Sequence, residues 1–239
     1  MIEKALKYIV GLKNPDVREL GGQTYSDKQL YRINHNPKAE PIELTTLSSL
    51  VEYISSEYDK RGKIFIHVVD PTTVKVLSAL DEDRVREHMV DVNAQIPHFN
   101  FNNFIGHEEF CINLQSVFEN NEDRALLLKF AGTIEKGTLA QYGDDGVTQK
   151  ATIKTGIASK GDAIVPNPVT LKAYRTFVEV EQPETSYIFR MKEGFDGKIL
   201  CGLFEADGGA WKIEAMKNIK QYLDDELISA YTNDIVILS

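Results

Sequence analysis

The segment at residues 157–191 constrains the fold more than any other part of this chain. It opens as a proline-punctuated loop and continues as two stretches rich in β-branched and aromatic residues. Runs of this kind, bounded by turn-forming residues, are typical of β-strands. We therefore expect strands at 171–180 and 187–192, joined by a short turn around Pro183.

The neighbouring segments extend this sheet. Apolar and polar residues alternate along 147–157, which predicts a strand with one face in water. Asp144, Asp145 and Gly146 precede it as a turn sequence. The apolar run at 198–204 predicts a further strand, so this half of the chain should form an antiparallel meander.

Helical spacing of apolar residues marks four further elements. A stripe that begins at Leu47 and runs to Tyr58 predicts a helix capped by Thr45 or Thr46. Similar spacing predicts helices at 107–119 and at 121–136, the second capped by Asn121. A last helix should begin near Gly209 after a glycine turn, and its stripe includes Trp211.

The first half of the chain also contains strand patterns. The nearly continuous apolar run at 63–70 predicts a strand buried on both faces, with His67 as a hydrogen-bonded core residue. Further strands are expected at 74–80, 87–94 and 234–239, and an aromatic-rich loop at 98–106.

Residues 1–43 form a separate pattern. A helix at 2–12 is followed by a hairpin whose turn is Gly21–Gly22, with strands near 17–20 and 23–33. This part is too short to bury a core, so we interpret it as an N-terminal arm. Residues 44–239 should form a single α+β body, built on a largely antiparallel sheet with packed helices.

Composition limits the function classes. The formal net charge is −9, which argues against broad binding to DNA or to anionic membranes. No apolar run is long enough to span a membrane, and the first residues lack the pattern of a secretory signal. Cys111 and Cys201 lie in apolar contexts, so we expect buried thiols, a reducing compartment and a cytoplasmic protein.

A local basic surface is the best candidate site. Residues 150–192 contain seven Lys or Arg and four Asp or Glu, a net charge of +3, against −12 for the remainder. This surface could bind an anionic ligand or nucleic acid through six residues: Lys154, Lys160, Lys172, Arg175, Arg190 and Lys192. The alternative is that Arg175 and Arg190 lie on the two strands of the predicted hairpin and pair with Glu179 and Glu181.

Catalytic and metal signatures are weak. Asp144 and Asp145 are similar to the paired carboxylates that hold two Mg²⁺ ions, but a hairpin turn explains them as well. His107 and the two acids that follow it lack the second histidine of a zinc helix and read as exposed first-turn residues. We therefore expect no cofactor and no metal, and a protein that is not an enzyme.

Five phrases of the sequence together resemble a known family. They lie at 20–30, 64–81, 110–134, 165–191 and 203–223. In this combination they are similar to the YfdQ-like domain of phage and prophage proteins. The resemblance implies a phage-encoded protein in the cytoplasm of an infected or lysogenic bacterium, encoded near recombination functions. It supplies no catalytic residues.

These observations predict a non-catalytic phage accessory protein that acts by binding, as a homo-oligomer. One alternative is a nucleic-acid-binding factor in phage recombination or replication that uses the basic surface. Another is an inhibitor of host defence, which blocks a host protein or sequesters a small nucleotide signal. The last is a metal-dependent phosphoesterase that uses Asp144 and Asp145.

Overall fold

The computed structural model describes most of the chain, which consists of two compact units, Met1–Ala39 and Glu40–Ser239. The described residues are 2–11, 15–29, 38–56, 59, 62–82, 84–133, 150–154, 160–164, 167–195, 197–228 and 234–239. Side chains are not described for residues 10, 133, 150–154 and 160–164. Among the described residues, none of the helices combines the length and the apolar character needed to cross a membrane.

The first unit contains a helix and the predicted hairpin. Its elements are α1 (Ile2–Gly11), β1 (Val17–Leu20) and β2 (Gln23–Ser26). Gly21 and Gly22 have φ angles of 61° and 77°, the left-handed pair that a tight two-residue turn requires. The hairpin is confirmed, with its second strand at Gln23–Ser26, and residues 30–33 of the predicted strand lie outside the described residues. The unit buries none of its described side chains.

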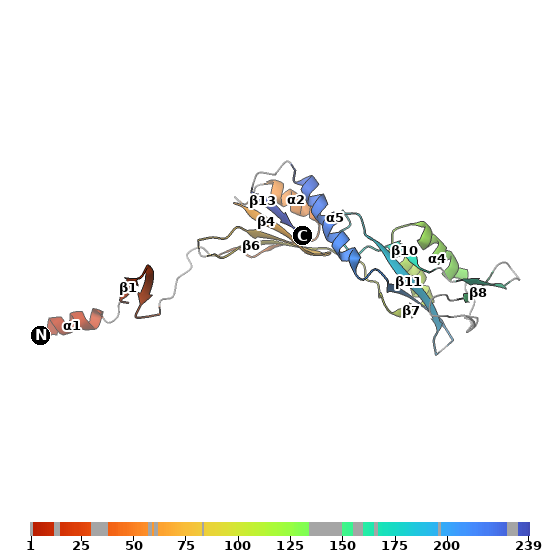
Figure 1. The fold of residues 1–239 in the computed structure, drawn as a ribbon, viewed down its shortest axis with the longest axis horizontal. Coiled ribbons are helices and arrows are strands. Elements are labelled where there is room, and N and C mark those ends of the chain that lie inside the picture. The colour runs from red at the N-terminus through yellow and green to blue at the C-terminus, as the bar shows by residue number, and fades with distance from the viewer. Residues whose placement is uncertain are drawn as a thin grey trace. The chain divides into compact units, whose positions relative to one another are not determined.

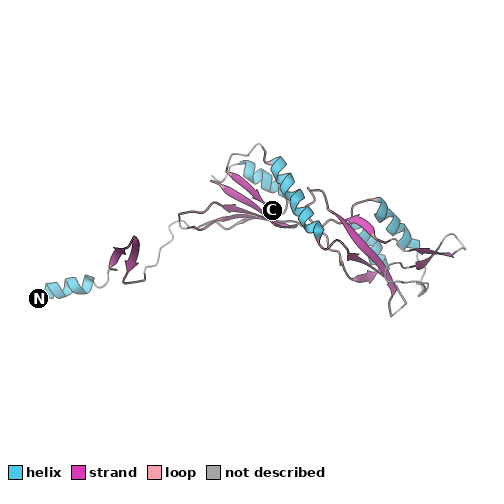
Figure 2. Cartoon of the chain, viewed as in Figure 1, coloured by secondary structure: helices cyan, strands magenta, loops and turns pink. Residues whose placement is uncertain are grey.

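The second unit, which we call the body, contains two larger sheets with helices beside each (Figure 1 and Figure 2). The first sheet has five strands in the order β13 (Ile235–Leu238), β4 (Ile64–Asp70), β5 (Thr73–Ser78), β6 (His88–Asn93) and β3 (Ile42–Leu44). Its three central strands are antiparallel, and each edge strand is parallel to its neighbour. Helices α2 (Leu47–Ser56) and α5 (Ala210–Glu226) share its core.

Strand β4 corrects one prediction. Burial alternates along it, with Ile64, Ile66 and Val68 in the core and His67 exposed. The prediction that both faces are buried was wrong, because helices cover only one face and Phe65 and Val69 lie on the other side. His67 is accordingly not a core histidine.

The second sheet has four antiparallel strands. Their order is β10 (Val169–Lys172), β11 (Glu184–Glu193), β12 (Ile199–Glu205) and β7 (Phe104–Gly106). Helices α3 (His107–Ser116) and α4 (Glu122–Thr133) pack on one face. A separate two-stranded sheet pairs β8 (Lys150–Lys154) with β9 (Lys160–Ile164). The predicted α+β class is confirmed, whereas β7 was predicted as part of a loop.

Predicted helix caps are found where the sequence placed them. Asn121 Oδ1 accepts the backbone N–H of Arg124 at 2.7 Å, which satisfies a free donor in the first turn of α4. Thr46 Oγ1 accepts the Ser49 N–H at 3.2 Å at the start of α2. Both caps use local sequence signals, which is why they could be predicted.

The predicted hairpin around Pro183 was wrong. β10 and β11 are antiparallel neighbours, but Lys172 pairs with Glu184, and residues 173–183 leave the sheet as a long connection. Phe177 and Val180 of this connection bury in the core of the five-stranded sheet instead. Arg190 therefore pairs with Gly202 of β12 and not with Phe177.

Candidate ligand pocket

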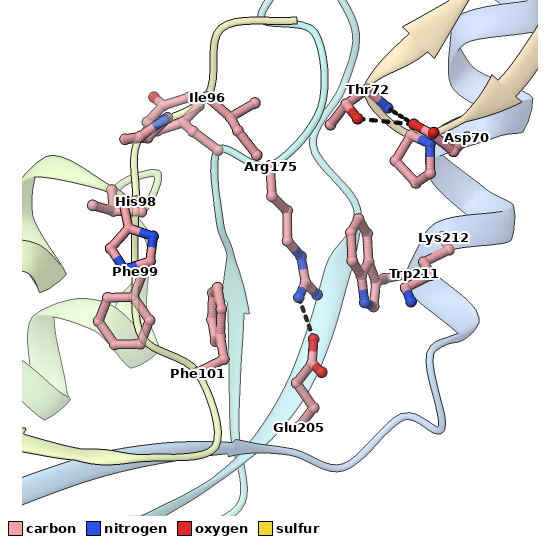
Figure 3. Close-up of a pocket in the computed structure, with 14 residues that line it drawn as sticks. Asp70, Thr72, Ile96, His98, Phe99, Phe101, Arg175, Glu205, Trp211 and Lys212 are labelled. Atoms are coloured by element: carbon pink, nitrogen blue, oxygen red, sulfur yellow. Dashed lines mark hydrogen bonds and ion pairs between the residues drawn. The ribbon is translucent and has the colours of Figure 1, made fainter.

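A pocket of about 560 Å³ lies where several connections of the body converge (Figure 3). Its walls come from the β4–β5 turn, residues 96–101, the connection after β10, the end of β12 and the start of α5. Ligand sites typically have volumes of about 300–1,000 Å³ and mostly apolar walls with a few polar groups. The volume of this pocket and its mostly apolar lining fall within that range.

Arg175 is the central charged residue of this pocket. Its side chain is only 6% exposed, and its Nη1 forms an ion pair and hydrogen bond with Glu205. Its Nη2 donates to Thr185 Oγ1 at 2.6 Å. Because an unpaired buried charge is very costly, the carboxylate of Glu205 is needed to keep the guanidinium inside the protein.

Aromatic rings surround the same guanidinium. Its Cζ lies 3.6 Å from the ring centroid of Trp211, 5.2 Å from Phe101 and 5.7 Å from Tyr187. Such contacts are attractive because the ring faces carry negative partial charge. Burial raises the pKa of the Tyr187 phenol, with the Arg175 charge acting in the opposite direction, so this ring remains neutral.

Buried polar side chains hold the Arg175 connection in place. Gln182 Oε1 accepts the Arg175 N–H at 3.2 Å, and Gln182 Nε2 donates to the carbonyls of Phe177 and Val180. Thr176 Oγ1 donates to the Pro71 carbonyl in the β4–β5 turn. Since these side chains satisfy backbone groups that no strand partner reaches, the connection can be buried without a sheet.

Two donors beside the pocket have no acceptor in the described part of the protein. They are Arg175 Nε and Trp211 Nε1, and each atom is fully buried. Leaving a buried donor unsatisfied costs about 1–3 kcal/mol. Each donor requires an oxygen or nitrogen acceptor, which a water or a ligand can supply after a small movement of either side chain.

The rim of the pocket contains a balanced set of charges. Asp70 Oδ1 accepts the N–H and the hydroxyl of Thr72 at 2.7 and 2.8 Å, which closes the β4–β5 turn. Lys212 is exposed, with its Nζ 5.9 Å from the Trp211 ring centroid. The lining therefore has two cations and two carboxylates.

The N-terminus of α5 is already capped. Asp207 accepts the N–H groups of Gly209 and Trp211 at 3.0 and 3.1 Å. Gly208 and Gly209 have φ angles of 65° and 84°, so the predicted strand-to-helix glycine turn is confirmed. A phosphate at this helix end would have to displace the Asp207 carboxylate.

The predicted basic surface is divided by the fold. Arg175 lies in the pocket, whereas Arg190 and Lys192 follow each other on the outward face of β11. Lys172 Nζ lies 2.7 Å from Glu181 and 3.9 Å from Glu184, and the Glu181 hydrogen bond raises the pKa of Lys172. Two further members of the set, Lys154 and Lys160, pair in β8–β9 and have side chains outside the described residues.

The alternative pairing of Arg175 with Glu179 or Glu181 is not observed. Glu179 instead accepts the N–H groups of Leu47 and Ser48 at 2.9 and 3.4 Å, at the positive end of the α2 dipole. Glu181 pairs with Lys172, and Arg175 pairs with Glu205. The predicted register of the hairpin was wrong, so its charge pairs were wrong too.

Other candidate chemistry gains no support from the described residues. Asp144 and Asp145 lie outside them, and within them no group of three or more His, Cys, Asp or Glu could hold a metal ion. His107 is partly buried, and its Nε2 donates to the Ala131 carbonyl at 2.7 Å, so its prediction as an exposed residue was wrong. Cys201 is buried and Cys111 half-buried, both as free thiols.

Sequence reasoning missed most of the pocket. Trp211 was predicted as part of the buried stripe of α5, which is correct for Ala215, Ile219 and Leu223. The stripe continues one turn beyond the core, and there Trp211 becomes a pocket wall. The aromatic-rich loop that contains Phe101 was predicted, but Phe101 and Glu205 approach Arg175 only in the folded chain, so no local pattern assigned them to a site.

Comparison with known proteins adds no relative: no protein-family model, curated protein or solved structure matches this chain. The resemblance to the YfdQ-like domain therefore stays a prediction.

Proposed function

We propose that this protein acts by binding, and that the pocket beside Arg175 takes a small ligand of the nucleobase class, a nucleoside or a nucleotide. The observation that carries the proposal is the pair of buried donors without an acceptor in the described part of the chain, Arg175 Nε and Trp211 Nε1. Both require an acceptor, and both adjoin a cavity with aromatic walls.

The shape of the pocket favours a flat ligand. His98, Phe99 and Phe101 lie on one side of Arg175, and Trp211 lies on its other side (Figure 3). The guanidinium fills the space between Phe101 and Trp211, with its Cζ 5.2 Å and 3.6 Å from their ring centroids, so a planar ring would contact the edge of this stack from the open side of the pocket. Carbonyl oxygens on the ring edge would then accept from the two buried N–H groups.

The charges favour a base in the interior and any phosphate at the rim. Glu205 already neutralises Arg175, so a multiply charged anion in the interior would face a carboxylate. Lys212 lies on the exposed side and can contact a phosphate there without being buried. This arrangement supports recognition of the ring first and of the phosphate second.

Calorimetric titration with matched nucleosides and nucleoside monophosphates tests the proposal, with inorganic phosphate and aliphatic carboxylates as non-aromatic controls. We expect heat of binding with at least one base, and tighter binding of its monophosphate. Phe101→Leu should weaken both ligands, whereas Lys212→Ala should weaken only the monophosphate. The control variant Phe65→Leu, in the other sheet, should bind like the parent protein. Absence of binding by every base, with the protein folded, would contradict the proposal.

The biological role that we propose rests on the sequence resemblance: a non-catalytic phage accessory protein in the cytoplasm of an infected bacterium.

We also propose that this protein self-associates through its N-terminal arm. Support comes from α1, whose apolar residues Ile2, Leu6 and Ile9 are 78%, 56% and 56% exposed. An isolated helix this short is marginal in water, so it needs a surface to pack on. Light scattering should give a mass above 26.9 kDa. Removal of residues 1–39 should reduce the mass to that of one body, and a monomeric parent protein would refute the self-association.

A further inference from the structure

The outward face of the four-stranded sheet has the composition of a second binding surface. Residues of β11 alternate, with Tyr187, Phe189 and Met191 buried against α3 and α4. The residues between them, Ile188, Arg190 and Lys192, lie on the opposite side and are exposed or half-exposed.

Strand register extends this surface across two more strands. Ile188 is opposite Phe204, Arg190 is opposite Gly202, and Gly202 is in turn opposite Phe104 of β7. Phe104 and Phe204 are both half-exposed and are separated by 5.2 Å between ring centroids, at an interplanar angle of 65°. We call the group Phe104, Arg190, Lys192 and Phe204 the outward aromatic-basic face.

Gly202 allows the two rings to lie against the sheet. A Cβ at this position would be 3.0 Å from Phe204 Cε2 and 3.3 Å from Phe104 Cδ1. It would also be 2.7 Å from the backbone oxygen of Asn103, which cannot move aside easily. The rings therefore cover the glycine in a fixed position instead of standing away from the strand.

Two cations adjoin the aromatic pair. Lys192 Nζ lies 4.2 Å from the Phe104 ring centroid, and Arg190 stands directly opposite the glycine that both rings cover. Lys172 is on the same side of the sheet, but Glu181 and Glu184 offset its charge. The basic residues of outward β11 thus lie beside the aromatic pair.

We propose that the outward aromatic-basic face binds single-stranded nucleic acid. Solvent-accessible aromatic rings on an antiparallel sheet, with cations beside them, are an arrangement by which proteins stack unpaired bases and hold the backbone, and both rings here are half-exposed. A duplex offers no unstacked base to these rings, and the net charge of −9 weakens purely electrostatic binding. This inference is independent of the Arg175 pocket, whose lining shares no residue with this face.

Fluorescence anisotropy of labelled oligothymidine, with a duplex of equal length, tests the inference across a range of salt concentrations. We expect the single strand to bind more tightly than the duplex. Phe104→Ala with Phe204→Ala should weaken binding roughly 5- to 150-fold per stacked base lost. Arg190→Ala with Lys192→Ala keeps the rings and should make the log–log salt slope shallower by about 1.4, or about 0.7 for each phosphate contact.

The matched control carries Lys63→Ala and Lys217→Ala, which remove the same charge from positions elsewhere in the body. It should bind oligothymidine like the parent protein. The inference is overturned if the parent protein binds no oligothymidine at low salt, or if the duplex binds equally well. It is also overturned if the folded Arg190→Ala, Lys192→Ala variant binds like the control, since another surface or a protein partner would then be indicated.

Discussion

Replacement of Glu205 by Gln tests how the buried guanidinium of Arg175 is held. The substitution keeps the shape of the side chain and one oxygen acceptor, but it removes the charge that faces Arg175 Nη1. Removal of one partner from a buried ion pair costs about 3–5 kcal/mol. Because the Glu205 side chain is 28% exposed, water offsets part of the loss, and we expect about 2 kcal/mol.

Arg175→Met should lower the free energy of unfolding less than Glu205→Gln does, because it leaves no buried charge unpaired. It removes the buried cation, and the remaining Glu205 carboxylate can take up water through its exposed side. A thioether also packs favourably among aromatic rings, here Trp211, Phe101 and Tyr187. The double variant Arg175→Met, Glu205→Gln should therefore lose less free energy of unfolding than the two single variants together, by at least about 1 kcal/mol.

Urea unfolding of the four proteins measures these differences from the midpoint and slope of each transition. For a body of this size, a loss of about 2 kcal/mol should also lower the melting temperature by about 4–8 °C. Fully additive effects, or a Glu205→Gln variant within about 0.5 kcal/mol of the parent protein, would refute the claim that this pair stabilises the buried charge.

Three further outcomes follow from the packing. Gly202→Ala should lower the free energy of unfolding by about 2 kcal/mol, measured by thermal unfolding, because the new Cβ would lie 2.7 Å from a backbone oxygen. Gly132→Ala should be neutral or slightly stabilising, because no atom lies within 4 Å of its new Cβ. Equal effects of the two substitutions would contradict this reasoning. Asn121→Ala should cost about 1 kcal/mol by removing the cap of α4, and an unchanged urea midpoint would refute the role of that cap. Burial raises the pKa of the Cys201 thiol to about 12 from 9.0, so stability is full below 9.0 and should fall above it by up to about 1.4 kcal/mol per pH unit. The fall should be shallower in Cys201→Ala, and an identical fall in that variant would contradict the assignment.

Features that depend on residues close in sequence could be predicted. The stripe of α5, the Asn121 cap and the Gly21–Gly22 turn each use positions within a few residues of one another, and each is found in the structure. The α+β class follows from the same local signals. Local patterns are reliable here because tertiary contacts reinforce them.

The 173–183 connection could not be predicted in the same way. Its apolar residues alternate like those of a strand, yet Phe177 and Val180 pack in the core of the other sheet. The side chains of Thr176 and Gln182 make this possible by bonding to buried backbone groups. Periodicity cannot distinguish a strand from a buried connection with its own polar side-chain partners.

The candidate site shows the same limit. Arg175 was predicted as a ligand-binding residue, but as part of a surface with Arg190, because a straight hairpin would place both on one sheet. Once the connection leaves the sheet, Arg175 lies in the pocket and Arg190 lies on the outward face. Trp211, Glu205 and Phe101 join Arg175 from segments distant in the chain, a convergence that no local pattern contains.

The most direct test of the pocket uses the fluorescence of Trp211, which is the only tryptophan of the chain. Its indole lines the cavity and lies against the Arg175 guanidinium, so a base bound beside this pair should change its emission. We expect a saturable change in emission on titration with nucleosides, absent with ribose or inorganic phosphate and shifted to higher concentration in Phe101→Leu. Emission that stays constant with every nucleoside, while the protein remains folded, would contradict the assignment of this pocket as a nucleobase site.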